Sequence, residues 1–586
     1  MDGLALTEPG KSPSDPVALE VVKNALAAIA EEMGLTTVRA AYSSVVKEGG
    51  DSTAAVFDHR GRFIAQSMGA PLMHLSSLRP SLRSLLDHFP PESMTDGDVY
   101  ASNDPYRGGI HSNDVMVFRP VFIDDILGFF TCALLHVADL GGMAAGGLPA
   151  NATEMFQEGL VLPPVPLVVA GQPNQPILDV IAANSRTPEK VLGDIRAMMA
   201  ATNLGAGRLG DLATRYGLAR LHRITGELLD YTERRTRMGI EALPDGTYTG
   251  SFVIDDDGVD PTADHEVRVT LVVDGSTITA DFAGTSTQAP GPINASVSQT
   301  TSGVLFAIRC MLAPDIPVND GTFRPLELRL PPGTLVNPNP PAALNARMAT
   351  VMAVAEAMLG AFSQLDPARA VAASCNVHVY IMSGIDSGGQ PWAFMDPQFG
   401  GSGARSDRDG VDVTGPLVFG SGGAFHTVEA YEQEHPVRFE RFELWTDSGG
   451  AGRWRGGTGS RRDIRILTDG RFTGRATDRC RRPPPGILGG SPGAGGGWVL
   501  NHGTPDEQPL PAKVTAHPLR AGDMITMFTS AGGGYGDPLE RDPELVAADV
   551  GDNLVSPEAA HRDYGVAINP ENGEVDPLAT AALRSK

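Results

Sequence analysis

The chain has 586 residues, of which 41% are hydrophobic and 20% are charged, and its formal net charge is −24. This length predicts more than one hydrophobic core in a folded protein, and the 69 glycines and 46 prolines follow no collagen-like period. The acidic balance and the lack of a dense Lys/Arg run argue against nucleic acid and anionic membranes as partners.

The sequence predicts no segment that would direct the chain into or across a membrane. Its first residues, MDGLALTEPGKSPSDP, lack the apolar core of a signal peptide, and no uninterrupted apolar run reaches about 18 residues. The four cysteines are far apart and form no CxxC pair. We therefore expect a cytoplasmic protein with reduced thiols.

The first part of the chain is predicted to mix helices and strands. Pro16 and an apolar stripe indicate a helix over residues 16–34, which Gly34 would end. Residues 52–67 favour a β-hairpin, and residues 74–89 favour a helix that Pro80 would break or kink.

Strands and then long helices are expected between residues 98 and 243. The pattern predicts strands at residues 115–122 and 127–138 and a short helix before Pro163 within residues 152–164. A helical stretch punctuated by glycines is expected at residues 188–243.

Beyond residue 243 the chain alternates again before it becomes rich in glycine. Strands are expected at residues 246–258 and 265–284, and helices at residues 301–313 and 349–365. The second helix is apolar nearly all round, so it should be buried. Strands and glycine turns are expected within residues 377–384, 439–457, 460–467 and 521–530. Two short capped helices are expected at residues 542–552 and 556–566.

These elements predict an α+β or mixed α/β fold with several subdomains. A helical and mixed N-terminal part would be followed by a glycine-rich, β-rich C-terminal part. We expect a flexible tail at residues 1–15 and an N-terminal mixed domain at residues 16–240. A middle α/β domain would follow at residues 241–366, and a glycine-rich, β-rich domain at residues 367–586.

Two copies of an HxxD spacing stand out between residues 98 and 139. His111 and Asp114 flank a turn in GGIHSNDV, and His136 and Asp139 occur at a strand end in HVADLGG. Two imidazoles and two carboxylates suit zinc, manganese or iron better than magnesium or calcium, and Asp104 in NDPY would be a further ligand. Two unrelated polar turns explain the same spacing, because Asn, Asp and His are common in turns.

Other polar and glycine-rich stretches also allow two interpretations each. Glu48 and Asp51 precede a strand, either as a solvated turn or as carboxylates for acid–base work. His74 lies in an apolar stretch and, by itself, is typical of a buried core histidine. The glycine runs after residue 399 contain no P-loop, so they indicate either close backbone packing or a pocket whose N–H groups hold an oxyanion.

Several stretches together resemble the hydantoinase B / oxoprolinase family, which also includes the acetone carboxylase alpha subunit. They span the chain in order and include EGGDSTAAVFDHRGRFIAQS, NDPYRGGIHSND, HVADLGG, ATEMFQEGL, WTDSGGAGRWRGGTG and AGGGYGDP. The resemblance implies a B-type subunit of an ATP-dependent enzyme. A hydantoinase A-type partner would bind ATP and phosphorylate a small cyclic amide, such as a hydantoin, a lactam or 5-oxoproline.

The resemblance also implies roles for individual residues. Metal ligands are expected at His111, Asp114, His136 and Asp139, with Asp104 nearby. The bound ion would be Zn, Mn or Fe, and it would assist hydrolysis of the phosphorylated substrate. The partner, not this chain, would use ATP in a hetero-oligomer.

Four acidic residues match further positions of the family. Glu48 and Asp51 match the acidic pair before the first strand, and Glu154 and Glu158 match acidic positions in ATEMFQEGL. Departures from the family pattern include IHSND where the family usually has THLPD, which places the difference at Ser112 and Asn113. A ketone carboxylase subunit and a non-catalytic scaffold for the ATP-binding subunit remain alternative functions.

Overall fold

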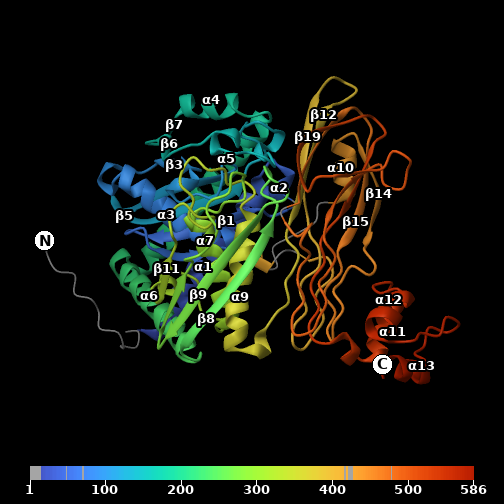
Figure 1. Ribbon diagram of the computed structural model, residues 1–586. Helices are drawn as coiled ribbons and strands as arrows, with labels where there is room; N and C mark the ends of the chain where they lie inside the picture. Colours follow the sequence, from blue (N-terminus) through green and yellow to red (C-terminus); the bar gives the residue numbers. More distant parts are fainter. Residues whose placement is uncertain are drawn as a thin grey trace.

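The computed structural model describes residues 15–47, 49–68, 72–414, 417–419, 427–476 and 478–585. Helices and several sheets form a mixed α/β protein, which confirms the expected fold class. Figure 1 shows the elements up to α9 in one body and the C-terminal sheets beside it, with three short helices at the chain end. The proposed boundaries at residues 15, 240 and 366 stay predictions.

A seven-stranded antiparallel sheet in the order β2-β1-β5-β4-β3-β6-β7 organises the first part of the chain. Its strands are β1 Ser52–Asp58, β2 Phe63–Gln66, β3 Val99–Ser102, β4 Asp114–Ile123, β5 Ile126–His136, β6 Val165–Val169 and β7 Gln172–Pro173. The predicted hairpin and both predicted apolar strands are thereby confirmed. At the hairpin turn Gly61 has a φ of 71°, and the Asp58 carboxylate accepts the backbone N–H of Arg60 at 2.9 Å.

Helices cover both faces of this sheet, which explains why its central strands are apolar on both sides. Helices α1 and α5 share one buried cluster with the sheet, and α3 and α7 contribute to the cluster on the opposite face. The helices of this part are α1 Pro16–Ala40, α2 Ser44–Lys47, α3 Leu72–His88, α4 Gln175–Ala183, α5 Pro188–Tyr216 and α6 Leu218–Glu241.

Three helix predictions need correction. Helix α1 does not end at Gly34 but continues to Ala40. Gly34 lies where the helix packs closely on Ser67, since a Cβ there would lie 3.0 Å from the Ser67 Cβ. Pro80 lies inside α3 without breaking it. The short helix expected in ATEMFQEGL is only a 3-10 turn, Met155–Gln157.

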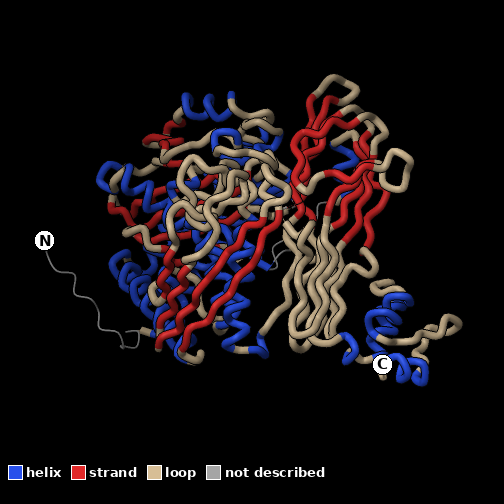
Figure 2. Tube along the Cα trace, viewed as in Figure 1, coloured by secondary structure: helices blue, strands red, loops and turns tan. Residues whose placement is uncertain are grey.

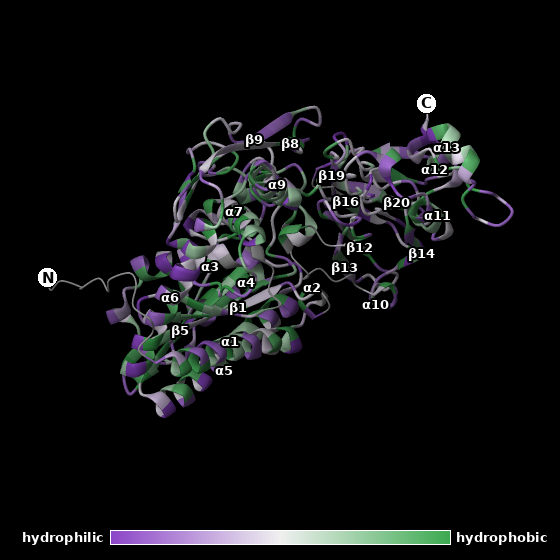
Figure 3. Ribbon diagram, turned by 90° about the horizontal axis from the view of Figure 1, so that it is seen from below, coloured by the Kyte–Doolittle hydropathy of each residue, from purple (hydrophilic) through white to green (hydrophobic). Residues whose placement is uncertain are grey.

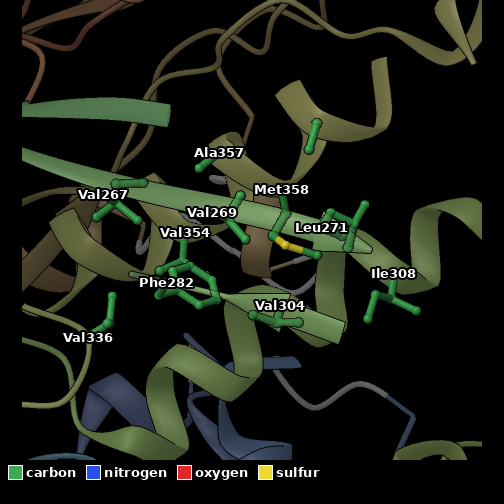
Figure 4. Close-up of a cluster of buried hydrophobic side chains, with 14 of the residues drawn as sticks. Val267, Val269, Leu271, Phe282, Val304, Ile308, Val336, Val354, Ala357 and Met358 are labelled. Atoms are coloured by element: carbon green, nitrogen blue, oxygen red, sulfur yellow. The ribbon is translucent and has the colours of Figure 1, made fainter. Parts of the chain in front are cut away.

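The middle of the chain forms a four-stranded sheet in the order β11-β10-β9-β8, with helices packed on it. The elements are β8 Gly246–Asp255, β9 Asp264–Asp274, β10 Thr277–Asp281, β11 Leu326–Arg329, α7 Val297–Met311, α8 Asp320–Phe323 and α9 Met348–Leu365. Figure 4 shows Val267, Val269 and Leu271 of β9 beside Val354 and Met358 of α9.

Helix α9 is buried, as its apolar surface predicts. Among the described residues it is the one helix long and apolar enough to cross a membrane, yet 72% of it is buried inside the protein. Its close contact with β8 requires a glycine, because a Cβ at Gly250 would overlap the Ala357 carbonyl. Figure 3 shows the largely hydrophobic α9 beside β8 and β9.

Two antiparallel sheets follow, in the orders β13-β12-β16-β19 and β14-β15-β20-β17-β18. Side chains from both sheets form one buried cluster that contains Tyr380, Phe472 and Trp498. The strands are β12 His378–Ile385, β13 Pro391–Gln398, β14 Val437–Leu444, β15 Ser460–Ile466, β16 Gly470–Ala476, β17 Gly497–Leu500, β18 Gln508–Leu510, β19 Lys513–Leu519 and β20 Met524–Phe528. Within residues 439–457, where a strand and glycine turns are expected, the strand ends at Leu444 and the glycine loop follows it.

Short helices follow or flank these sheets: α10 Val428–Glu434, α11 Pro543–Gly551, α12 Pro557–Tyr564 and α13 Pro577–Arg584. Side chains of Asp542 and Ser556 cap α11 and α12, as expected for the predicted capped helices.

The glycine runs pack backbone against backbone. The N–H of Gly457 donates to the Ser402 carbonyl at 2.9 Å, and the N–H of Gly532 donates to the Gly457 carbonyl at 2.8 Å. A Cβ at Gly532 would overlap the Ser402 carbonyl. Figure 2 shows these loops as extended segments side by side beneath the C-terminal strands. Because these amides already have acceptors, the structure favours close packing over an oxyanion pocket for these glycines.

Candidate metal centre

Three strand ends meet at one edge of the seven-stranded sheet. Asp114 begins β4 and is paired in register with His136, which ends β5. Ser52 at the start of β1 is paired with Leu135, and the backbone N–H of His136 donates to the Asp51 carbonyl at 3.2 Å. The antiparallel register thus places Asp51, His136 and Asp114 side by side across neighbouring strands.

His111, Asp114 and His136 form a compact buried group. The two oxygens of Asp114 contact the two imidazoles separately: Oδ1 lies 3.0 Å from His136 Nδ1, and Oδ2 lies 3.1 Å from His111 Nε2. The ring centroids are 5.0 Å apart, and one ligand-type atom from each residue lies within 4.8 Å of the others. The structure therefore brings together three of the five proposed ligands.

The three residues fit a divalent metal. Nitrogen and oxygen ligands lie about 2.0–2.2 Å from a zinc ion, so two ligands of one ion are separated by roughly 3 Å. The observed nitrogen–oxygen distances of 3.0 and 3.1 Å are compatible with that separation, and they are also the distances of direct His–Asp hydrogen bonds. Two imidazoles and a carboxylate are donors that zinc, manganese and iron accept.

The protonation states suit the same chemistry. Burial, reinforced by the Arg347 cation, lowers the pKa of His111 to about 3, so its imidazole is neutral near pH 7. Burial alone would raise the pKa of Asp114, but His111, His136 and Arg347 hold it well below its usual range. A neutral imidazole and an ionised carboxylate are the forms that bind metal ions.

Asp51 is held beside this group by His74. His74 Nε2 lies 3.2 Å from Asp51 Oδ1, and His74 Nδ1 lies 2.8 Å from the Thr53 hydroxyl. His74 is therefore a buried histidine with both nitrogens partnered, as the apolar stretch around it indicates, and it also orients Asp51. The His74 contact lowers the pKa of Asp51 despite burial. Glu48 lies outside the described residues.

A buried arginine from a later part of the chain contacts the group, and a second one holds a nearby segment; the sequence identified neither. Arg347, just before α9, places Nη2 3.2 Å from Asp114 Oδ2. Arg475 of β16 donates to the carbonyl and the side-chain oxygen of Asn345 at 2.5 and 2.7 Å. The sequence gives only a weak indication of Arg347, which is a single cation directly before the most apolar helix.

Glu158 lies near the same arginines, whereas Glu154 does not. Glu158 is buried, and its Oε1 accepts the backbone N–H groups of Leu344 and Asn345, both at 2.8 Å. Burial outweighs these contacts and raises its pKa to about 8. Glu154 is exposed and precedes the 3-10 turn, so its side chain is not part of the buried group.

The structure does not bring Asp104 or Asp139 into the His–Asp–His group. Asp104 caps a short turn by accepting the Tyr106 N–H at 2.9 Å, and its other oxygen lies 3.2 Å from Arg107 Nε. Both Asp139 oxygens accept hydrogen bonds, from the N–H groups of Gly141 and Gly146 and from Arg186. Both aspartates therefore shape loops next to the group.

Ser112 and Asn113, where the chain departs from the family pattern, also fix loops. The Ser112 hydroxyl donates to the Glu158 carbonyl at 3.0 Å. The Asn113 amide donates to the carbonyls of Val137 and Gly146 at 3.1 and 2.8 Å. These bonds tie the His111 loop to the segment that follows β5.

Comparisons with known proteins point to one family. The sequence model described as Hydantoinase B/oxoprolinase matches residues 15–538. The B-type subunit of a putative D-/L-hydantoinase from Pseudomonas sp. strain NS671 is 33% identical over 97% of this chain and 98% of its own length.

Two solved structures share the fold. The crystal structure of an ATP-dependent caprolactamase from Pseudomonas jessenii has a TM-score of 0.87 and 30% identity, covering 98% of this chain and 100% of its own. A nucleotide-free acetone carboxylase structure has a TM-score of 0.89 at 20% identity, covering 98% of this chain and 83% of its own. At that identity the second likeness concerns the fold alone.

Proposed function

Because the chain belongs to the Hydantoinase B/oxoprolinase family, we propose that it is the B-type subunit of an ATP-dependent cyclic-amide hydrolase. It would act on a substrate that an A-type, ATP-binding partner has phosphorylated. The buried His111–Asp114–His136 group at the sheet edge is the observation that carries this proposal. The names of a hydantoinase B-type subunit and an ATP-dependent caprolactamase among similar proteins support it.

The proposed division of labour follows from the stability of amides. An unstrained amide carbon is a poor electrophile, and phosphorylation of its oxygen by the partner would activate it. A divalent ion held by His111, Asp114 and His136 would supply a Lewis acid and lower the pKa of water.

The chain's own side chains would handle charge and protons around that centre. Asp51 directly precedes β1, and its carbonyl accepts the backbone N–H of His136. Its pKa is lowered, so its carboxylate is ionised and would accept a proton from an attacking water. His74 would hold that carboxylate in position through its 3.2 Å contact. Arg347, 3.2 Å from Asp114 Oδ2, would balance the negative charge of the buried ligand set.

Ring opening coupled to ATP hydrolysis tests the proposal. The complex of this chain with its A-type partner would be assayed with hydantoin, 5-oxoproline and lactams, and its metal content measured by mass spectrometry. We expect His111→Ala and His136→Ala to lose bound metal and at least about 100-fold in activity, since ligand removal abolishes the centre. His88→Ala, an exposed histidine on α3, serves as the control.

Two outcomes would contradict the proposal. Full activity in both ligand variants would exclude the metal role and favour a scaffold. Bicarbonate-dependent turnover of a ketone, without ring opening of any cyclic amide, would instead favour the carboxylase chemistry that the shared fold with acetone carboxylase also allows.

A further inference from the structure

A row of three polar side chains leads from the interior of the protein to Asp51. Thr53 Oγ1 lies 2.8 Å from His74 Nδ1, and His74 Nε2 lies 3.2 Å from Asp51 Oδ1. Asp51 directly precedes β1 and Thr53 is two residues later, so their side chains lie on the same face of the strand. One imidazole of α3 therefore bridges two side chains that follow each other on that face.

The exposure of the three side chains shows which end of the row can meet a substrate. Thr53 is 1% exposed and the His74 side chain 2%, whereas the Asp51 side chain is 30% exposed. A hydroxyl, an imidazole and a carboxylate at such distances also occur in nucleophilic triads. A threonine that is 1% exposed does not reach a substrate, so Thr53 is the inner end of the row and Asp51 the outer end.

The donors and acceptors of the row determine where His74 carries its hydrogen. An ionised carboxylate only accepts hydrogen bonds, so the nitrogen that faces Asp51, Nε2, must be the donor. In a neutral imidazole Nδ1 is then an acceptor, and the Thr53 hydroxyl lies within reach to donate to it. The opposite tautomer would turn the Nε2 lone pair toward the carboxylate and repel it.

Thr53 is well placed for this one contact. Its backbone is held in the sheet by the register with Leu134 of β5. In the part of the chain that the structure describes, the hydrogen bond to His74 is the only one that its hydroxyl makes. His74 contacts Oδ1 of Asp51, which leaves Oδ2 to take a proton.

We propose that Thr53 is a positioning residue whose hydroxyl donates to His74 Nδ1 and so keeps the hydrogen of His74 on Nε2, where it holds the Asp51 carboxylate. The inference rests on the proposed function, because it assigns to Asp51 the proton from the attacking water. Thr53 and His74 do not touch the substrate and act only through Asp51.

Substitutions of Thr53 in the complex with the A-type partner test this role. Thr53→Val keeps the size and branching of the side chain but removes the hydroxyl. We expect kcat for ring opening to fall at least about tenfold, with KM and metal content as in the wild type. Thr53→Ser restores the hydroxyl and should recover most of the loss. Wild-type kcat in Thr53→Val would overturn the inference.

Thr131 on β5 supplies a matched control. It is also a buried threonine of the same sheet, and its hydroxyl donates to the Thr202 carbonyl at 3.0 Å. Thr131→Val therefore removes one buried hydrogen bond without changing the row that ends at Asp51. Its melting temperature should fall as in Thr53→Val, while its kcat should stay at the wild-type value. An equal loss of kcat in both variants would mean that the effect of Thr53 is only structural.

A double-mutant cycle separates positioning from a general loss of structure. Because Thr53 acts through His74, Thr53→Val should lower kcat in the wild type but not in a His74→Leu background. Two independent structural defects would instead multiply. The same factor in both backgrounds would therefore contradict the inference.

The hydrogen on His74 is also measurable without turnover, by NMR of the full chain with ¹⁵N-labelled histidine. The resonances that disappear in His74→Leu identify this residue. We expect the wild type to show a protonated Nε2 and an unprotonated Nδ1, and Thr53→Val, but not Thr131→Val, to shift the Nδ1 resonance. A protonated Nδ1 in the wild type would overturn the inference.

The NMR measurement distinguishes the inference from the proposed function. If the wild-type complex opens no cyclic amide, the proposed function fails. The state of His74 in the wild type and in Thr53→Val then still decides whether the Thr53 hydroxyl sets its tautomer.

Discussion

At the scale of single residues, Arg347 is the side chain with the clearest expected effect. It is buried and contacts Asp114 Oδ2, the same oxygen that lies 3.1 Å from His111 Nε2. Arg347→Met would leave a buried carboxylate without its cation, and removing one partner of a buried pair costs roughly 3–5 kcal/mol. Thermal unfolding in EDTA should show this loss.

Added metal should compensate part of it. Zn²⁺ or Mn²⁺ would take over the neutralisation of Asp114, so the rise in melting temperature on adding metal should be larger in Arg347→Met than in the wild type. Arg369→Met, with a side chain 54% exposed, controls for loss of a surface arginine. Equal stability of Arg347→Met and wild type in EDTA would contradict the role of the pair.

The raised pKa of Glu158 predicts that the stability of the chain depends on pH. Its pKa is raised to about 8, whereas an unfolded glutamate titrates near ~4.3, so between these values the folded chain holds a proton that the unfolded chain lacks. The free energy of unfolding should therefore fall as pH rises through this window. Glu158→Gln keeps an acceptor oxygen but cannot ionise. As pH rises, the free energy of unfolding of this variant should therefore increase relative to that of the wild type by on the order of 1 kcal/mol per pH unit.

Urea unfolding at pH 5, 6.5 and 8 measures this difference. Glu154→Gln changes an exposed carboxylate only a few residues away and should follow the wild type. A constant difference between Glu158→Gln and wild type across the three pH values would mean that Glu158 is already ionised in the folded chain.

The residue scale also shows how far the sequence identifies the site. The repeated HxxD spacing marks His111, Asp114 and His136, because strand ends bring polar residues to one sheet edge. It does not separate them from Asp139, whose distance from the group depends on a loop anchored by Arg186. Arg347 and Arg475 come from distant segments, and only the packing of three parts of the chain brings them near.

At the scale of elements, the close packing of the glycine loops requires glycine at particular positions, and substitutions there test this requirement. A Cβ at Gly532 would overlap the Ser402 carbonyl, and neither backbone is free to move because both take part in the loop hydrogen bonds. Gly532→Ala should therefore destabilise the chain by about 3 kcal/mol or more. Gly497→Ala in β17 meets no atom within 4 Å and is the control. Equal urea midpoints for both variants would contradict the close packing.

The same elements show which parts of the fold follow from local pattern. The hairpin at residues 52–67 and the strands around residues 115–138 are predicted correctly, because turn glycines and apolar runs are local signals. Helix α1 continues past Gly34 to Ala40, so a glycine inside a helical pattern does not by itself mark the end of a helix. The glycine runs are visible in the sequence, but their mutual backbone pairing is not.

At the scale of the whole molecule, buried arginines join the C-terminal helices to the glycine loops: Arg455 Nε lies 3.4 Å from Asp549 Oδ1, and Arg541 makes the shorter contacts. Arg541 donates to Asp409 at 2.6 and 2.8 Å and to Asp549 of α11 at 2.7 Å, and its side chain is 1% exposed. Arg541→Met would leave two carboxylates without this cation, so we expect a loss of roughly 3 kcal/mol and faster proteolysis after residue 538.

The catalytic proposal predicts that this loss is purely structural. Figure 1 shows α11, α12 and α13 at the end of the C-terminal sheets, away from β1 and β5 of the seven-stranded sheet. Below its unfolding transition, Arg541→Met should therefore have wild-type activity per folded molecule. On heating, it should lose that activity at a lower temperature than the wild type does. Arg562→Met removes an exposed pair with Asp563, which contributes little to stability, and should leave the melting temperature unchanged. An Arg541→Met variant with wild-type melting temperature would show that the helices are held mainly by their apolar contacts around Val546 and Tyr564.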